Sequence, residues 1–479
     1  MLYTSLRLLG TVALATAAPS VIKKDVVIVG GGASGAYAAV RLREDYGKSI
    51  ALIEKQDIIG GMVDSFTDAS TGQSFDYGVV SFIDSGNATG FFERLGIELG
   101  TTTSATVTTQ YYDFTTGRAV NYTPPAFADQ LAGLASFLPA AEKYEPLIQG
   151  PGYFDFPTDA ADIPEDLLLP FVDFVTKYGA EEALPFIYQT TGLGMGNVSA
   201  AQTIWALQAF GASMARSVLG IQGSLAPASG RNQDIYDAVA DLLADDVYTS
   251  TTVTSTRHLT GDAGAGVELT VRNAETGETS TIQAGKLLLA IEPTAENIEP
   301  FAVDPASAAV LAKFTYAREY TGIIDNADLV ANKSYFNMPA SAAPANHADF
   351  PQGSYTARVD YIGSGTDRNY FRVTIIGDDD LDSADDAKAM FQAEYSNLVA
   401  AGAIDGAADE QVSWVDFSVH GPMHAHVSEA DLKAGFLADL YALQGKNDTW
   451  WTGGAWAVNF QTHLWEFDDI ILPKLVASL

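Results

Sequence analysis

The residues with the clearest chemical meaning lie in the segment DVVIVGGGASG, residues 25–35. Gly30, Gly32 and Gly35 have the spacing G-x-G-x-x-G and directly follow a run of β-branched residues. In such a turn the first glycine permits the bend, the second lets the backbone approach a pyrophosphate, and the third lets the next helix pack on the strand. Free N–H groups at that helix start, where Ser34 lies, would then face the phosphates. The pattern predicts a dinucleotide site.

An acidic residue completes this motif. Glu54 ends the next predicted strand, 49–53, about 20 residues after Gly35, where a carboxylate can accept hydrogen bonds from both hydroxyls of an adenosine ribose. A carboxylate there disfavours a 2′-phosphate, so the ligand is expected to be FAD or NAD rather than NADP. The alternative is an ordinary glycine-rich turn, but the strand, helix and second strand around the glycines are the context that the motif requires.

The segments that follow favour FAD. Residues 56–66 read QDIIGGMVDSF and residues 75–79 read FDYGV. They resemble the flavin-containing amine oxidase superfamily, in which a Gly-Gly-Arg turn lies against the FAD pyrophosphate and an Asp-x-Gly segment leads into the flavin site. Met62 replaces the arginine, so backbone dipoles or another base must neutralise the phosphates. The resemblance implies cofactor contacts at Gly60, Gly61, Met62 and Val79.

Two later segments carry the same resemblance. In the superfamily a valine backbone touches the adenine, and Val253 is the matching position here, although a plain core valine fits the sequence equally well. Residues 450–475 resemble the segment in which a small-residue turn precedes a helix whose first N–H groups face the flavin pyrimidine. The match places Gly454 in the turn and both Thr462 and His463 at the helix start. A helix N-terminus there would stabilise the negative charge of reduced flavin.

The substrate side is less defined. Trp451 and Trp456 flank the predicted turn, so we expect them to line the substrate pocket, although such tryptophans are more often core residues. His424 belongs to VHGPMHAH, residues 419–426, which is expected to line the substrate cleft. Its His-x-His pattern could instead bind a metal, but no Asp, Glu or Cys accompanies it at ligand spacing, and we predict no metal. Many amine oxidases place a lysine beside flavin N5; no convincing counterpart is present, so the catalytic residue is unassigned.

The chain of 479 residues suits two domains of about 200 residues or more each. We predict an α/β fold with a discontinuous, Rossmann-like FAD-binding domain of the amine-oxidase type, built from residues 23–100, 220–295 and 445–479. Residues 101–219 and 296–444 are predicted to form a mixed-sheet substrate-binding domain with a helical insertion that caps the site, in which residues 200–219 form one helix.

The N-terminus predicts export. Residues 1–17 contain Arg7, an apolar run and an A-x-A cleavage pattern, which together indicate a signal peptide. The apolar run is shorter than the roughly 20 residues that a membrane span needs. The chain has no cysteine, so a cysteinyl-flavin bond is excluded and FAD is predicted to bind noncovalently. Glycosylation in a secretory pathway is indicated by N-x-S/T sequons at Asn87, Asn121, Asn197, Asn332 and Asn447.

The formal net charge of −34 argues against nucleic acids and anionic membranes as partners. Within its superfamily the chain most resembles secreted fungal FAD oxidoreductases of the beta-cyclopiazonate dehydrogenase type. We therefore predict a secreted FAD-dependent oxidoreductase that takes a hydride from a small organic substrate, such as an amine or a secondary metabolite, with O2 among the candidate electron acceptors. The alternatives are a redox-inactive nucleotide-binding secreted protein and an NAD-dependent dehydrogenase.

Overall fold

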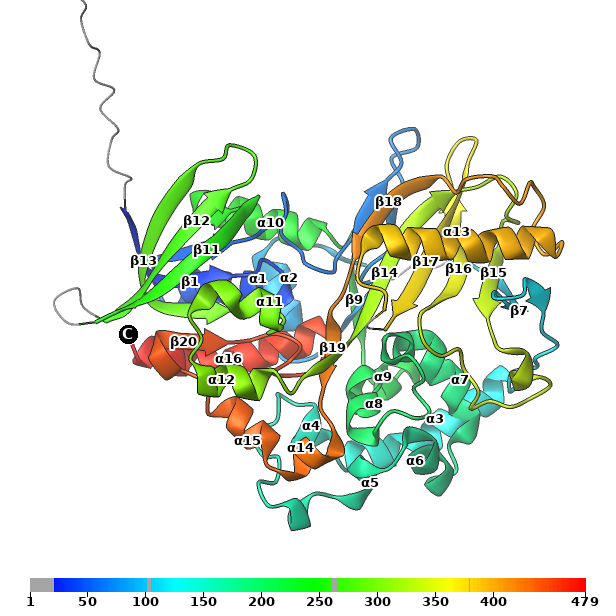
Figure 1. Cartoon of the computed structure of the whole chain (residues 1–479), viewed down its shortest axis with the longest axis horizontal. Helices are drawn as coiled ribbons and strands as arrows, with labels where there is room; N and C mark the ends of the chain where they lie inside the picture. Colours follow the sequence, from blue (N-terminus) through cyan, green and yellow to red (C-terminus); the bar gives the residue numbers. More distant parts are fainter. Residues whose placement is uncertain (1–20, 101–104, 261–264, 379) are drawn as a thin grey trace, which may run out of the picture.

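Two large β-sheets organise the chain, and each takes its strands from segments far apart in the sequence (Figure 1). The computed structural model describes residues 21–100, 105–260, 265–378 and 380–479. The predicted signal peptide, residues 1–17, lies outside the described residues. Apart from Val21 and Ile22 of β1, the strands of the first sheet fall within the segments predicted for FAD binding. Those of the second sheet fall within the segments predicted for the substrate, while the domain boundaries themselves stay a prediction.

The first sheet has a parallel centre. Its order is β10-β2-β1-β13-β12-β11, with β20 paired to the end of β13. Strand β1 lies between β2 and β13 and is parallel to both, and β20 is parallel to β13. The runs 26–29, 50–53 and 287–289 are buried and apolar, as expected of strands covered on both faces. The strands are β1 (Val21–Val29), β2 (Ile50–Ile53), β10 (Val247–Tyr248), β11 (Thr251–Leu259), β12 (Gly266–Asn273), β13 (Thr279–Leu289) and β20 (Thr449–Trp451).

Two helices from opposite ends of the chain pack together on this sheet. They are α1 (Ala33–Val40), which continues into η1 (Arg41–Asp45), and the C-terminal α16 (Gln461–Ala477). The Trp465 ring stacks on Tyr37 with 5.4 Å between centroids, and its indole N–H donates to the Ala33 carbonyl over 3.2 Å. The C-terminal helix is thereby held against the first turn of α1.

The second sheet is mixed, as predicted. Its order is β18-β14-β17-β16-β15-β7-β8, with β19 paired to β14. All neighbours are antiparallel except β15 and β7. Helix α13 (Ala384–Ala400) covers one face, where Phe371 and Val373 pack with Phe391 (Figure 1). The strands are β7 (Thr108–Asp113), β8 (Arg118–Ala119), β14 (Thr315–Asp325), β15 (Lys333–Asn337), β16 (Tyr355–Ser364), β17 (Asn369–Gly377), β18 (Trp414–Val419) and β19 (Met423–His426).

The other face of the second sheet packs against residues 75–77, which belong to the segments predicted for FAD binding. Ile323 of β14 and Tyr370 of β17 form a small buried cluster with Phe75 and Tyr77. The Thr321 hydroxyl donates to the Tyr77 carbonyl over 2.8 Å. The FDYGV segment predicted to enter the flavin site therefore lies against the substrate sheet.

The helical insertion is confirmed, with one correction. Residues 200–219 were expected to form one helix, but the helix breaks at Phe210 and Gly211, where a Cβ on Gly211 would lie 2.3 Å from the Gln149 amide. The insertion contains α3 (Phe127–Glu142), α4 (Glu145–Ile148), η2 (Ala160–Asp162), α5 (Glu165–Leu168), α6 (Phe171–Lys177), η3 (Glu181–Ala183), α7 (Leu184–Ile187), η4 (Tyr188–Gly192), η5 (Leu193–Met195), α8 (Thr203–Ala209) and α9 (Ala212–Val218).

Shorter elements join these units. No helix in the described ranges is both long and apolar enough to cross a membrane. The connecting elements are β3 (Ser65–Thr67), β4 (Ser74–Asp76), β5 (Phe82–Ile83), α2 (Ala88–Arg94), β6 (Leu99–Gly100), β9 (Ser224–Pro227), α10 (Asp234–Leu243), η6 (Ala244–Asp246), α11 (Ala295–Ile298), η8 (Glu299–Phe301), α12 (Pro305–Leu311), η9 (Ala340–Ala342), α14 (Glu429–Lys433), α15 (Phe436–Tyr441) and η10 (Lys446–Asp448).

Candidate functional site

The three glycines of the turn between β1 and α1 have different surroundings. Gly30 has φ +103°, and a Cβ there would lie 2.4 Å from the Ala290 carbonyl oxygen. A Cβ on Gly35 would lie 1.8 Å from the Gly30 carbonyl oxygen. Gly32, which caps α1, has φ −73° and ψ −167°, and its Cβ would meet only the Gly61 Cα at 3.5 Å. Packing within the protein thus requires the first and third glycines, whereas the second stands at an open approach to the helix start.

Glu54 lies directly beside this turn. It is 8% exposed, its Oε2 accepts the Gly31 N–H over 2.7 Å, and its Oε1 accepts the Gln56 N–H over 2.8 Å. Each carboxylate oxygen can accept more than one hydrogen bond, so both keep capacity for ribose hydroxyls. The Thr251 N–H bonds the Glu54 carbonyl over 2.9 Å. That bond places Val253, a buried residue of β11, next to the position expected for the adenosine.

The Gly60-Gly61 loop docks on the glycine-rich turn. The Gly60 N–H donates to the Gly31 carbonyl over 2.9 Å, and a Cβ on Gly61 would lie only 2.8 Å from the Gly32 Cα. Met62 accepts the Val79 N–H over 3.1 Å through its carbonyl and brings no charge. Two loops that carry the expected pyrophosphate contacts are therefore in direct backbone contact.

Helix α16 begins where the sequence predicted a helix, but the backbone N–H groups that are free at its start differ from the predicted ones. Thr462 is 1% exposed and its hydroxyl has no partner. His463 was expected to offer a free backbone N–H, but that N–H donates to the Phe460 carbonyl over 3.0 Å. In the described part of the chain, the Gln461 and Thr462 N–H groups have no protein acceptor, as the first turn of a helix requires. Burial lowers the pKa of the His463 imidazole to about 4, so this side chain is neutral at pH 7.

A series of neighbouring residues runs from the glycine-rich turn toward the second sheet, and two of them, Glu292 and Asn459, were not predicted as site residues. A Cβ on Gly30 would lie 3.0 Å from the Ile291 side chain, and Glu292 follows. A Cβ on Gly454 would lie 3.0 Å from Glu292 Oε1 and 1.9 Å from Asn459 Oδ1. Glu292 could have been predicted from the sequence as a site residue, because it follows the buried strand KLLLA by two positions and ligands of open α/β sheets bind at the carboxyl ends of the strands.

His424 lies at the substrate end of this line. Its Nδ1 is 3.1 Å from Asn459 Nδ2, and its φ of +50° is rare for a residue other than glycine. A Cβ on Gly194 would lie 2.6 Å from His424 Nε2 and 3.5 Å from Glu319 Oε2, so the helical insertion and β14 meet here. Burial, with a contribution from His426, lowers the pKa of His424 to about 4 and keeps the ring neutral.

The other substrate candidates lie elsewhere. Trp456 has no exposed surface and stacks on Trp451 with 5.5 Å between centroids, and Trp451 is 2% exposed. The Trp456 indole N–H is buried without a partner, and the pocket role of the two rings stays a prediction. His420, from the same VHGPMHAH segment, pairs with Asp64 over 2.5 Å. Within the described residues, no three His, Cys, Asp or Glu side chains are placed to hold a metal ion.

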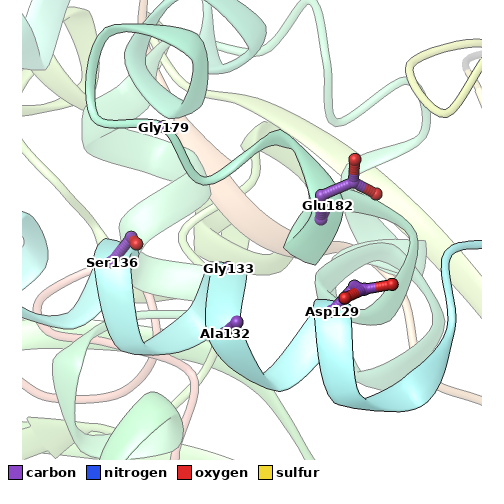
Figure 2. Close-up of a pocket in the computed structure, with 6 residues that line it drawn as sticks. All are labelled: Asp129, Ala132, Gly133, Ser136, Gly179 and Glu182. Atoms are coloured by element: carbon purple, nitrogen blue, oxygen red, sulfur yellow. The ribbon is translucent and has the colours of Figure 1, made fainter.

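Polar atoms without a protein partner are found along the three matched segments, and they fit FAD. The Ser34 hydroxyl lies in the first turn of α1, Gln233 Oε1 faces Gly60, and the Thr462 hydroxyl lies in the first turn of α16. Buried polar atoms are normally bonded, so several orphans around open helix starts indicate a polar ligand. The hollow in Figure 2, lined by Asp129, Ala132, Gly133, Ser136, Gly179 and Glu182, contains none of these residues and lies within the helical insertion.

Known proteins with similar sequences agree with this geometry. The NAD(P)-binding Rossmann-like domain family matches residues 28–95. The chain is 30% identical over 494 residues to the FAD-dependent oxidoreductase pigF of Monascus ruber, with all of both chains covered. It is 28% identical to the beta-cyclopiazonate dehydrogenase of Aspergillus flavus, covering 96% of this chain and 94% of the relative.

Solved structures show the same fold at lower identity. A CLA-producing fatty acid isomerase from P. acnes superposes with a TM-score of 0.69 at 14% identity, covering 94% of this chain and 98% of the isomerase. A putrescine oxidase superposes with a TM-score of 0.61 at 17% identity, covering 96% and 100%. The FAD-binding fold of the amine-oxidase type predicted from the sequence is thus confirmed.

Proposed function

The chain belongs to the FAD-dependent oxidoreductase family of its fungal relatives, and from this premise we propose that it is a secreted enzyme that oxidises a small organic molecule. FAD, bound noncovalently, would accept a hydride at N5 from a carbon next to a heteroatom or a conjugated system. The observation that carries the proposal is the backbone contact between the glycine-rich turn and the Gly60-Gly61 loop, with α16 bonded to α1 through Trp465 and with unpartnered polar atoms on Ser34, Gln233 and Thr462.

The nucleotide half would be held mainly by the backbone. The N–H groups at the start of α1 and the Ser34 hydroxyl would bind the pyrophosphate, since a helix N-terminus favours anions. Glu54 would accept the ribose hydroxyls, and the Val253 backbone would contact the adenine. The contact between Gly32 and Gly61 brings a second stretch of backbone close to the phosphates without a side chain between them.

The redox half would be served by the Gln461 and Thr462 N–H groups, which would stabilise negative charge near N1 and C2=O. On the substrate side, the neutral His424 and Glu319 meet at Gly194 and would orient the substrate. Many amine oxidases use a lysine beside flavin N5, and Lys313, just before β14, is not placed for that role, because its ammonium lies 3.5 Å from Asp431.

Acid precipitation of the purified protein tests the cofactor. Yellow FAD in the supernatant is expected, and flavin in the pellet would contradict noncovalent binding. A folded, colourless preparation would favour an NAD-dependent dehydrogenase. Anaerobic mixing with amines and with conjugated fungal metabolites should bleach the bound flavin for at least one donor class, and readmission of O2 shows whether oxygen accepts the electrons. A bound flavin that no donor reduces would favour a redox-inactive protein.

Export needs its own measurement. The proposal is that residues 1–17 are removed and that the protein leaves the cell with glycans on some of its five sequons. Expression in a fungal host followed by N-terminal sequencing of the medium fraction should give a chain that begins directly after Ala17. Retention of the full-length chain inside the cell would refute secretion without affecting the flavin chemistry.

A further inference from the structure

Glu292 carries a carboxyl group that the protein leaves unpartnered. It follows β13 at the edge where the glycine-rich turn lies, and Ile291 contacts that turn. Its Oε2 is sealed from solvent and has no hydrogen-bond partner, whereas its Oε1 faces the backbone at Gly454. Among the described residues it forms no ion pair. Glu292 as a whole is only partly buried, but a carboxyl oxygen sealed from water without any partner is costly, so this position indicates that a ligand completes the group.

The groups around Glu292 do not supply a positive charge. Tyr316 of β14 is the titratable neighbour; burial, and then Glu292, raise the pKa of its hydroxyl, which is also buried and unpartnered. On the C-terminal loop, the neighbours are Gly454 and the neutral amide of Asn459. His424, behind Asn459, is neutral at pH 7. Burial raises the pKa of Glu292 to about 8, so at pH 7 this carboxyl is protonated and can donate a hydrogen bond.

We propose that Glu292 is a cofactor ligand, a neutral carboxylic acid that donates a hydrogen bond to the ribityl or flavin part of FAD. The inference rests on the FAD binding proposed above. Its geometric basis is the position of the carboxyl between the pyrophosphate turn at Gly30 and the loop that leads into α16. Gly454 is glycine because a side chain there would enter the space of the Glu292 and Asn459 side chains. Ionised, Glu292 would instead repel the anionic cofactor.

The test is FAD affinity as a function of pH, measured by titrating FAD into the deflavinated full-length protein. If FAD binds only the protonated form, wild-type affinity falls about tenfold between pH 6.5 and pH 9, because binding must then take up a proton. Glu292→Gln keeps a donor that does not titrate, so its affinity is expected to stay within about twofold over this range. Glu292→Ala is expected to bind about tenfold or more weakly at pH 6.5.

Glu394 provides a matched control. It is a buried glutamate of α13 whose pKa burial raises to about 7, and its carboxylate accepts the N–H of Thr356 in β16 of the second sheet. Glu394→Gln is expected to show the wild-type fall in affinity. A Glu292→Gln variant that follows the wild-type pH profile, or a Glu292→Ala variant with wild-type affinity at pH 6.5, would overturn the proposal. A wild-type protein that binds no FAD at any pH would refute the proposed function as well.

Discussion

Replacing Gly32 with alanine separates ligand binding from folding at the glycine-rich turn. Its φ of −73° and ψ of −167° are accessible to alanine, and the new Cβ would meet only the Gly61 Cα at an ordinary contact distance of 3.5 Å. Gly35→Ala provides the contrast, because its Cβ would lie 1.8 Å from the Gly30 carbonyl oxygen. We expect the first variant to fold like the wild type and the second to lose stability.

The effect of Gly32→Ala on FAD affinity can be estimated from the cost of crowding. A methyl group forced into a packed contact typically costs about 1 to 3 kcal/mol. A loss of this size at the pyrophosphate would weaken FAD binding by about 5- to 140-fold. The deflavinated protein has no such contact to lose, so its unfolding temperature should stay at the wild-type value.

Fluorescence titration of FAD into the deflavinated protein gives the dissociation constant, and thermal unfolding of the same preparation gives the stability. Gly223→Ala is a suitable control, since its Cβ would also find its nearest neighbour at 3.5 Å, in Asp84. A Gly32→Ala protein that binds FAD within twofold of the wild type would refute the assignment of this turn to the pyrophosphate. A Gly35→Ala protein of unchanged stability would refute the packing argument.

Three further predictions concern single side chains. Glu54→Ala is expected to weaken FAD binding roughly tenfold or more, because charge-assisted hydrogen bonds to the ribose are lost; an unchanged dissociation constant would make Glu54 a structural acid only. Proline at Gln461, the first residue of α16, should lower the flavin midpoint potential with FAD still bound, whereas proline at His463 removes a bond within the protein and should lower the unfolding temperature. An unaltered potential in the Gln461→Pro protein would place the flavin elsewhere. Burial raises the pKa of Asp166, but hydrogen bonds to its carboxylate, above all from Lys177, outweigh burial and hold the pKa at about 2. These bonds therefore stabilise the folded protein above about pH 4, and that stabilisation is lost as the pH falls toward 2. Asp166→Asn should flatten this acid limb of the unfolding temperature, and an unchanged limb would show that other groups cause it.

Local spacing was enough to predict the strands, turns and helix starts proposed to hold the nucleotide. The turn at Gly30, the acid at Glu54 and the start of α16 near Thr462 each depend on residues close together in the sequence, and the structure forms all three elements. Glu292 and Asn459 were missed because their importance comes from a meeting between the end of β13 and the C-terminal loop. A single sequence shows each residue alone, without the neighbour that gives it a role.

The expectations for the tryptophans and for residues 200–219 depend on tertiary contacts of the same kind. Trp451 and Trp456 flank the Gly453-Gly454 turn in the sequence, but β20 and the following turn direct both rings into an aromatic core. Position next to a site does not fix the direction of a side chain. The helix expected across residues 200–219 was interrupted because Gln149 occupies the space beside Gly211, a tertiary contact that outweighs local helix propensity.

The replacement of the expected arginine by Met62 raises the question of how a chain with a net charge of −34 could hold an anionic cofactor. The structure suggests an answer based on removing negative charge rather than adding positive charge. Burial keeps the Glu292 carboxyl protonated at pH 7. The carboxylate of Glu54 already accepts two backbone N–H groups, which offset its charge before any ligand arrives. In the proposed complex, the positive end of α1 would act on the phosphates in a buried setting, where dipoles have a larger effect than they do in water. The arginine is dispensable on this account because the site has little negative charge left to compensate.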